Sequence, residues 1–242
     1  MRTRARLTIT AIAFGLSSSI GMADDLAAFN AAVDDVASHY RLAASYLRTG
    51  NADLGGLEVD QVRAAWITLT KSVRANTPDT FRNNPFFDST LEQVSYHTEK
   101  AVEYVDHGNL KAAERVMISI RDALSQLRRA NNLYLLADCV LDANRAMDTL
   151  YVYETTPPNL SEQSVAAAVQ SSAEVYEGIL RRCDRMASDR TKQDPEFRRL
   201  IDGATASLRL IPKAAREHDS GLLHRVLIEM RSFDNLLFFR FG

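Results

Sequence analysis

Residues 109–156 read NLKAAERVMISIRDALSQLRRANNLYLLADCVLDANRAMDTLYVYETT and contain neither glycine nor proline in 48 consecutive positions. Gly108 precedes this stretch and Pro157 follows it. Glycine and proline are the residues that most often interrupt a helix, and the stretch between them is rich in good helix formers. The whole of it is therefore predicted to be helical.

The apolar residues of this stretch change phase halfway along. The first half has them at alternating spacings of three and four, and so does the second half, two residues out of step. The first seam is Leu110, Ala113, Met117, Ile120, Leu124 and Leu127, and the second is Leu133, Leu136, Val140, Ala143, Met147 and Leu150. Successive residues of a helix are about 100° apart around its axis, so a shift of two residues moves the apolar seam to nearly the opposite face of the helix. We interpret residues 128–132 as the joint between two helical domains, either inside one continuous helix or at a kink between two helices, with a groove between the domains.

The rest of the chain extends this pattern to an all-α fold of two tandem four-helix bundles, each up-down-up-down. The first bundle is predicted over residues 24–129 and the second over 130–242. Loops are expected at the glycine-rich residues 50–57 and at the polar run 188–194, and Pro212 should kink the helix that contains it. The expected helices outside the central stretch are 24–48, 59–74, 86–106, 161–186, 195–217 and 220–239.

The two halves match each other at an offset of 110 residues. Trp66 then falls on Tyr176, and the helix start Pro85-Phe86-Phe87 falls on Pro195-Glu196-Phe197. The match indicates an internal duplication. The alternative is that the two halves match only because any two helices with a heptad pattern of apolar residues can be aligned, without a common origin.

The N-terminal residues 1–23 have the pattern of a secretory signal peptide: three arginines, a short apolar run, then small residues ending at Ala23, after which cleavage is expected. Their removal changes the formal net charge from −2 to −5, because 26 Lys and Arg then face 31 Asp and Glu. The periplasm is the expected location, with secretion as an alternative. An acidic chain argues against nucleic acid as a partner, and no later stretch is apolar for long enough to cross a membrane.

Cys139 and Cys183 are the two cysteines of the chain. In an oxidising compartment a disulfide between them is expected if packing of their helices brings the two Cα atoms within about 7 Å. The other interpretation is a pair of buried thiols that act as small apolar side chains.

Each half resembles the periplasmic four-helix-bundle cytochromes, of the soluble b type and of the cytochrome c-prime type. The resemblance lies in the Pro-x-Phe helix start, the turn His107-Gly108-Asn109, and an alanine-rich last helix that ends in arginine and aromatic residues. It implies an axial haem ligand at Met147. It places the axial histidine near Phe238 and Arg128, and neither side chain can replace an imidazole. No C-x-x-C-H motif is present, so a haem-free scaffold is expected.

Glu99, Glu103 and His107 follow one another at four-residue steps and could hold a divalent ion from one helix face. The competing interpretation is a solvated face, because the apolar seam of that helix runs elsewhere. The aromatic C-terminal end, with Phe239 and Phe241, is a candidate contact for a second copy of the chain.

No motif for nucleophilic catalysis or phosphate binding is found in the sequence. We therefore expect an exported, non-enzymatic protein without a cofactor, whose bundles bind a small ligand or a partner protein of the cell envelope. The alternative is a b-type haem protein or metal-binding protein in periplasmic electron transfer or metal handling.

Overall fold

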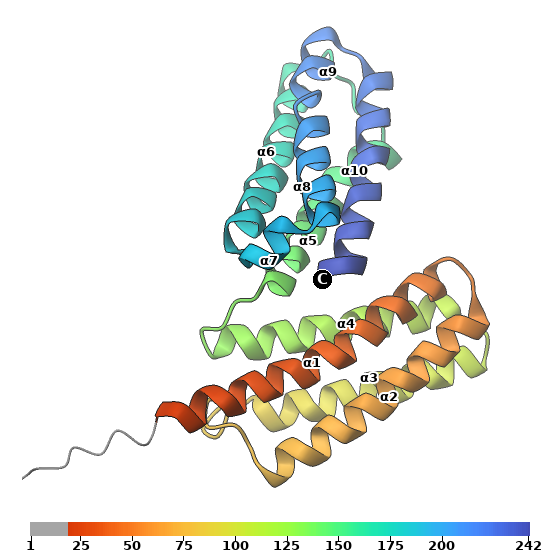
Figure 1. The fold of residues 1–242 in the computed structure, drawn as a ribbon. Helices are drawn as coiled ribbons and strands as arrows, with labels where there is room; N and C mark the ends of the chain where they lie inside the picture. The colour runs from red at the N-terminus through yellow and green to blue at the C-terminus, as the bar shows by residue number, and fades with distance from the viewer. Residues whose placement is uncertain (1–18) are drawn as a thin grey trace, which may run out of the picture.

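The computed structural model describes residues 19–242, and all ten elements in that range are helices (Figure 1). The all-α prediction is confirmed. The predicted signal peptide falls mostly on residues 1–18, outside the described range. Among the helices of residues 19–242, none has the length and apolarity that a membrane span requires. The helices are α1 Ser19–Arg48, α2 Ala52–Ala75, α3 Phe87–Asp106, α4 Leu110–Ala130, α5 Leu136–Thr155, α6 Gln163–Met186, α7 Asp189–Gln193, α8 Pro195–Leu208, α9 Ile211–Glu217 and α10 Ser220–Phe241.

The buried side chains form two clusters, which lie in two groups of helices. Helices α1 to α4 pack on one another around the first cluster, which includes Trp66 and Ile120. Helices α5, α6, α8, α9 and α10 surround the second, which includes Met147 and Tyr176. Figure 1 shows the second group standing across the first. The first seam packs in the first cluster and the second seam, from Leu136 on, in the second cluster, as their phase difference predicts. Leu133, which is predicted to lie in the second seam, packs against the first cluster. The domain boundary at residues 129 and 130 stays a prediction that this division supports.

The central stretch is two helices and not one, so the continuous-helix alternative is wrong. Residues 131–135 separate α4 from α5. Asn132 has the left-handed backbone conformation, with φ of 56°. Asparagine tolerates this conformation better than most residues. The Leu133 N–H then donates to the Arg128 carbonyl at 2.9 Å, which closes the end of α4. The helix therefore ends without a glycine or a proline.

The predicted glycine-rich loop is also wrong beyond residue 51, because α2 begins at Ala52 and contains two glycines. The Asn51 side chain accepts the Leu54 N–H at 3.1 Å and starts the helix. A Cβ atom on Gly55 would lie 2.8 Å from a methyl carbon of Leu47 in α1. Gly55 therefore lies where the two helices approach closely, and a larger residue there would require the Leu47 side chain to shift.

The helix predicted over residues 195–217 is divided into α8 and α9. Its break falls just before Pro212, where a kink is predicted. The pyrrolidine ring of a proline clashes with the carbonyl group four residues earlier, and proline has no N–H to donate. Leu208, four residues before Pro212, is accordingly the last residue of α8. The predicted loop 188–194 includes the short helix α7.

A disulfide joins α5 to α6 in the second group. Cys139 and Cys183 are bonded, with their Cα atoms 5.5 Å apart, and no free cysteine is present in residues 19–242. Of the two interpretations that the sequence leaves open, the disulfide is the one found.

The aromatic end of α10 is divided between the two groups. The Phe238 ring lies 6.3 Å from that of Tyr40 in α1, and the Phe241 ring lies edge-on to Phe197 in α8 at 5.0 Å. These contacts lie within one chain. Association of two copies through this end stays a prediction.

Removal of the disulfide should destabilise the protein without changing its helix content. A Cys139→Ala, Cys183→Ala double variant is expected to lose about 2–4 kcal/mol in free energy of unfolding, because the bond closes a loop of 44 residues in the unfolded chain. Urea denaturation followed by circular dichroism measures this. A reducing agent should lower the stability of the unsubstituted protein by a similar amount and leave the variant unchanged; equal stabilities of the two proteins would contradict the role of the bond.

Candidate functional site

A buried ion pair fixes the connection between α4 and α5. The Arg128 guanidinium donates from Nε to Asp138 Oδ2 at 2.9 Å and from Nη2 to Oδ1 at 2.6 Å. The side chains are 8% and 0% exposed. Asp138 also accepts the backbone N–H of Leu135 at 2.9 Å, at the start of α5. A bidentate pair shielded from water has a defined geometry. It therefore sets the direction in which α5 leaves α4.

Arg121 of α4 is buried where the two groups of helices meet, and only 4% of it is exposed. Its Nη1 donates to Asn144 Oδ1 of α5 at 2.6 Å, and its guanidinium lies 4.8 Å from the ring centre of Phe238 in α10. Its Nε has no hydrogen-bond partner among the described residues. Burial lowers the pKa of the guanidinium, but an arginine remains protonated in proteins. Arg121 therefore places a positive charge between the two groups.

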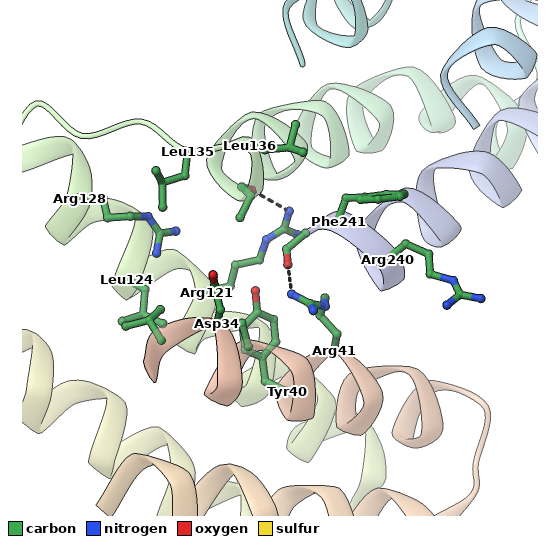
Figure 2. A pocket seen from close by; sticks show the side chains of 14 residues that line it. Asp34, Tyr40, Arg41, Arg121, Leu124, Arg128, Leu135, Leu136, Arg240 and Phe241 are labelled. Carbon is green, nitrogen blue, oxygen red and sulfur yellow. Dashed lines mark hydrogen bonds between the residues drawn. The ribbon is translucent and has the colours of Figure 1, made fainter. Parts of the chain in front are cut away.

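A cleft of about 390 Å³ lies beside Arg121, and we call it the arginine cleft. Figure 2 shows that its walls come from α1, α4, the start of α5 and the end of α10. Arg41 closes one side by donating to a main-chain oxygen of Gly242, the last residue of the chain, at 2.6 Å. The charged side chains on its walls are Arg41, Arg121, Arg128, Arg240 and Asp34.

The arginine cleft carries more positive than negative charge. Arg128 is compensated by Asp138. Arg121 donates to the uncharged side chain of Asn144, and Arg41 donates to a main-chain oxygen of Gly242, the last residue of the chain. Arg240 is exposed and lies over the ring of Phe239. Within residues 19–242 none of these three forms an ion pair with an Asp or Glu side chain. Asp34 provides a single opposing carboxyl group. Its burial raises its pKa, and the nearby Arg41 lowers it in part.

The remainder of the cleft wall is mostly apolar. Val33 and Leu124 line it from the first group, and Leu135, Leu136 and Phe241 from the second. Tyr40 is 2% exposed, and Figure 2 shows its hydroxyl directed into the cleft near Arg41 and Arg121. Burial raises the pKa of this hydroxyl, so the hydroxyl stays protonated and can donate a hydrogen bond to an acceptor in the cleft.

A second hollow between the groups, of about 570 Å³, has the opposite character, and we call it the paired groove. Its arginines face carboxylates: Arg145 lies 2.7 Å from Asp122, and Arg231 lies 2.8 Å from Asp148. Arg121 lines both hollows. The charges of the paired groove are thus largely compensated within the protein, whereas the buried Arg121 has no ion pair with an Asp or Glu side chain among residues 19–242.

Asp234 is a buried carboxylate at the edge of the paired groove, 2% exposed. Its Oδ1 accepts from Asn144 Nδ2 at 2.7 Å and from the Tyr176 hydroxyl at 3.4 Å. Burial raises its pKa to about 6, while the Asn144 hydrogen bond and the charge of Arg231 oppose the rise. Asn144 therefore connects Arg121 of the first group with Asp234 of the second.

The residues singled out for haem or metal lie away from both hollows. Met147 is fully buried in the second apolar cluster. Glu99 pairs with Arg63 at 2.9 Å and Glu103 with Lys100 at 2.6 Å. His107 Nδ1 lies 2.7 Å from the carbonyl oxygen of Glu103. In the range that the structure describes, no three His, Cys, Asp or Glu side chains are grouped closely enough to share an ion.

Sequence reasoning located the joint and the expected groove at residues 128–132, and Arg128 does line the arginine cleft. It missed Arg41, Arg121 and Arg240. Arg41 and Arg240 are far apart in the sequence and meet only through folding. The sequence contained one weak indication that Arg121 is buried, because it directly follows Ile120 of the apolar seam. A charged side chain next to a buried seam is rarely buried itself unless it has a partner.

Comparison with known proteins gives no relative from which a role could be taken. No protein-family model matches the chain, and neither the curated proteins nor the solved structures give a match.

Loss of the buried carboxylate at the joint should destabilise the protein strongly. Asp138→Ala leaves the Arg128 charge buried without its partner, which costs about 3–5 kcal/mol in free energy of unfolding. The matched control is Asp122→Ala, which breaks the exposed pair with Arg145 and should cost at most about 1 kcal/mol. Urea denaturation of both variants measures the difference. Equal losses would show that the buried pair does not fix the joint.

The raised pKa of Asp234 predicts a pH dependence of stability. Between about pH 4 and pH 6 the folded protein holds a proton on Asp234 that the unfolded chain has released, so this residue makes stability fall as pH rises. Asp234→Asn removes that contribution. From pH 4 to pH 7 the variant should gain about 3 kcal/mol relative to the unsubstituted protein, at about 1.4 kcal/mol for each pKa unit. Parallel stability curves across this range would contradict a raised pKa.

Proposed function

We propose that the chain is an exported, non-enzymatic binding protein that holds a small ligand in the arginine cleft, on a scaffold that resembles the four-helix-bundle cytochromes but without haem. The observation that carries the proposal is Arg121, which lines the cleft, is only 4% exposed and has a buried Nε without an acceptor among residues 19–242. Buried or half-buried charges without a partner are costly. A bound ligand of opposite charge supplies the partner.

The chemistry of the cleft favours binding over catalysis. Arginine guanidinium groups are donors that keep their proton, so they orient and hold a ligand but do not act as a general base. Binding sites for small molecules are typically concave and mostly apolar, with a few convergent polar groups, and have volumes of about 300–1,000 Å³. The arginine cleft, at about 390 Å³, has these properties.

Export to the periplasm is supported by two features far apart in the sequence. Residues 1–23 have the composition of a signal peptide. The disulfide between Cys139 and Cys183 fits an oxidising compartment. A ligand in the cleft would be one that reaches the periplasm.

The position of the cleft gives such a protein a means of responding to its ligand. Arg41 and Arg121 belong to the first group of helices, and Arg240 belongs to the second. A ligand that bridges them adds contacts between the groups. A ligand shifts the equilibrium between two conformations of a protein only if it makes different contacts in each. Binding would therefore favour the conformation in which the two groups of helices are held together.

Obstruction of the cleft tests the proposal. Ala137 lines the cleft and is only half-buried, so Ala137→Trp should fill part of the space without disturbing either apolar cluster. The control is Ala206→Trp on an exposed face of α8. Native mass spectrometry of the full chain purified from the periplasm should show a bound small molecule in the unsubstituted protein and in the control, and none in Ala137→Trp. No bound mass in any of the three proteins, or an equal one in all three, would overturn the proposal.

A further inference from the structure

We propose that the joint is a hinge, at which the two groups of helices swing apart about residues 131–135 while the Arg128–Asp138 pair stays intact. The inference does not depend on the nature of a ligand, so it goes beyond the proposed function. Three features of the joint lead to it: the packing between the groups, the position of their contacts, and the hydrogen bonding of Arg121.

The two groups of helices do not share one apolar core. Their buried side chains form separate clusters, and the apolar contact across the joint comes from Phe238 of α10 and Leu133 of the connection. The arginine cleft, of about 390 Å³, and the paired groove, of about 570 Å³, lie between the groups. Dense packing is what holds a protein interior in one arrangement, and interfaces between domains that lack it commonly allow relative motion. Packing alone therefore does not fix one group against the other.

Arginine side chains make the polar contacts that α1 and α4 form with the second group, within residues 19–242. The pairs are Arg41 with Gly242, Arg48 with Asn235, Arg121 with Asn144, Arg128 with Asp138, Arg129 with Asp142, and Arg145 with Asp122. The net contribution of such contacts to stability is modest, because water takes the place of the lost partner. Opening of the joint exchanges most of them for contacts with water.

The contact next to the connection is buried, and the most distant one is exposed. Arg128 and Asp138, on either side of the connection, are 8% and 0% exposed. Arg121 lies about two turns earlier in α4. Arg48 lines the paired groove together with Glu114, about four turns of α4 before Arg128, and its contact with the second group is exposed. A rotation about the connection displaces the distant contacts most, so they break while the buried pair is kept.

Arg121 is the buried contact that opening must break, and the closed arrangement satisfies it only in part. Its Nη1 donates to Asn144 at 2.6 Å, but its bond to the Ala137 carbonyl is long, at 3.5 Å, and its Nε has no acceptor within residues 19–242. Opening brings water to the guanidinium, and water can accept from each N–H. This gain offsets part of the lost Asn144 bond and reduces the free-energy difference between the closed and the open arrangement.

The hinge opens the joint on the side of the paired groove. Figure 1 shows the connection at one end of α4, with the second group standing across the first. The arginine cleft borders the connection, because Arg128 and Leu135 line it, so it changes less. The paired groove widens, and its apolar side chains Ile118, Leu141 and Phe238 become more exposed.

Double electron–electron resonance on the full-length purified protein tests the hinge. Spin labels at Lys111→Cys in α4 and Thr149→Cys in α5, both exposed positions, measure a distance between the groups. Labels at Lys71→Cys and Lys111→Cys measure a distance within the first group. Cys139 and Cys183 are bonded to each other, so only the introduced cysteines react. The pair between the groups should show a second, longer distance, and the pair within the first group should show one distance. A single distance between the groups in every protein measured would overturn the inference.

Loss of the exposed contacts should shift the population toward the longer distance. Arg48→Gln combined with Arg145→Gln removes two of them and should raise the ratio of open to closed protein about threefold, because exposed polar contacts are individually weak. Sodium chloride at about 1 M should shift the ratio in the same direction by screening the Arg145–Asp122 pair.

The matched control is Arg63→Gln, which breaks an exposed pair with Glu99 inside the first group and should leave the ratio unchanged. The distance within the first group should stay the same in every variant, which shows that the helices remain folded. An unchanged ratio in the double variant, or an equal shift in Arg63→Gln, would contradict the hinge. No ligand is added in these measurements, so their outcome leaves the proposed function untouched.

Discussion

The Arg128–Asp138 pair is the interaction on which the arrangement of the two helix groups depends. It joins the last turn of α4 to the first turn of α5 across a connection of only five residues. Both side chains are almost without contact with water, so each charge has the other as its main compensation. The left-handed Asn132 ends α4, and Asp138 holds the start of α5. Asn132 and Asp138 together define where the second group of helices begins relative to the first.

A polar network continues this connection across the joint. Arg121 of α4 donates to Asn144 of α5, and Asn144 donates to Asp234 of α10. A hydrogen bond of this kind contributes only about 0.5–3 kcal/mol net to stability, but it requires a defined geometry from each partner. The joint is therefore oriented by directional contacts. The apolar clusters hold each group together, and Phe238 of α10 adds an apolar contact across the joint because it packs in the first cluster beside Tyr40.

Most of the local structure could be predicted from the sequence, and the failures have physical causes. Most of the predicted core seam residues of α4 and α5 are buried, as 3.6-residue periodicity requires, and Leu110, Leu133 and Leu136 at the ends are partly buried. The glycine-rich segment 50–57 is mostly helical because Gly55 packs closely on Leu47 of another helix. The break at residues 131–135 was ambiguous because asparagine can continue a helix or end it, and its neighbours decide which.

The sequence by itself determined the all-α class, the phase change at the joint and the location of the two cysteines, because helical periodicity and composition are local properties of the chain. Tertiary structure alone decided the candidate site. Arg41, Arg121 and Arg240 lie on three helices and are up to 199 residues apart, yet they line one cleft. Whether a charged side chain has a partner depends on what packing brings beside it. Local sequence does not contain that information, so solvated and uncompensated arginines look the same until the helices are placed.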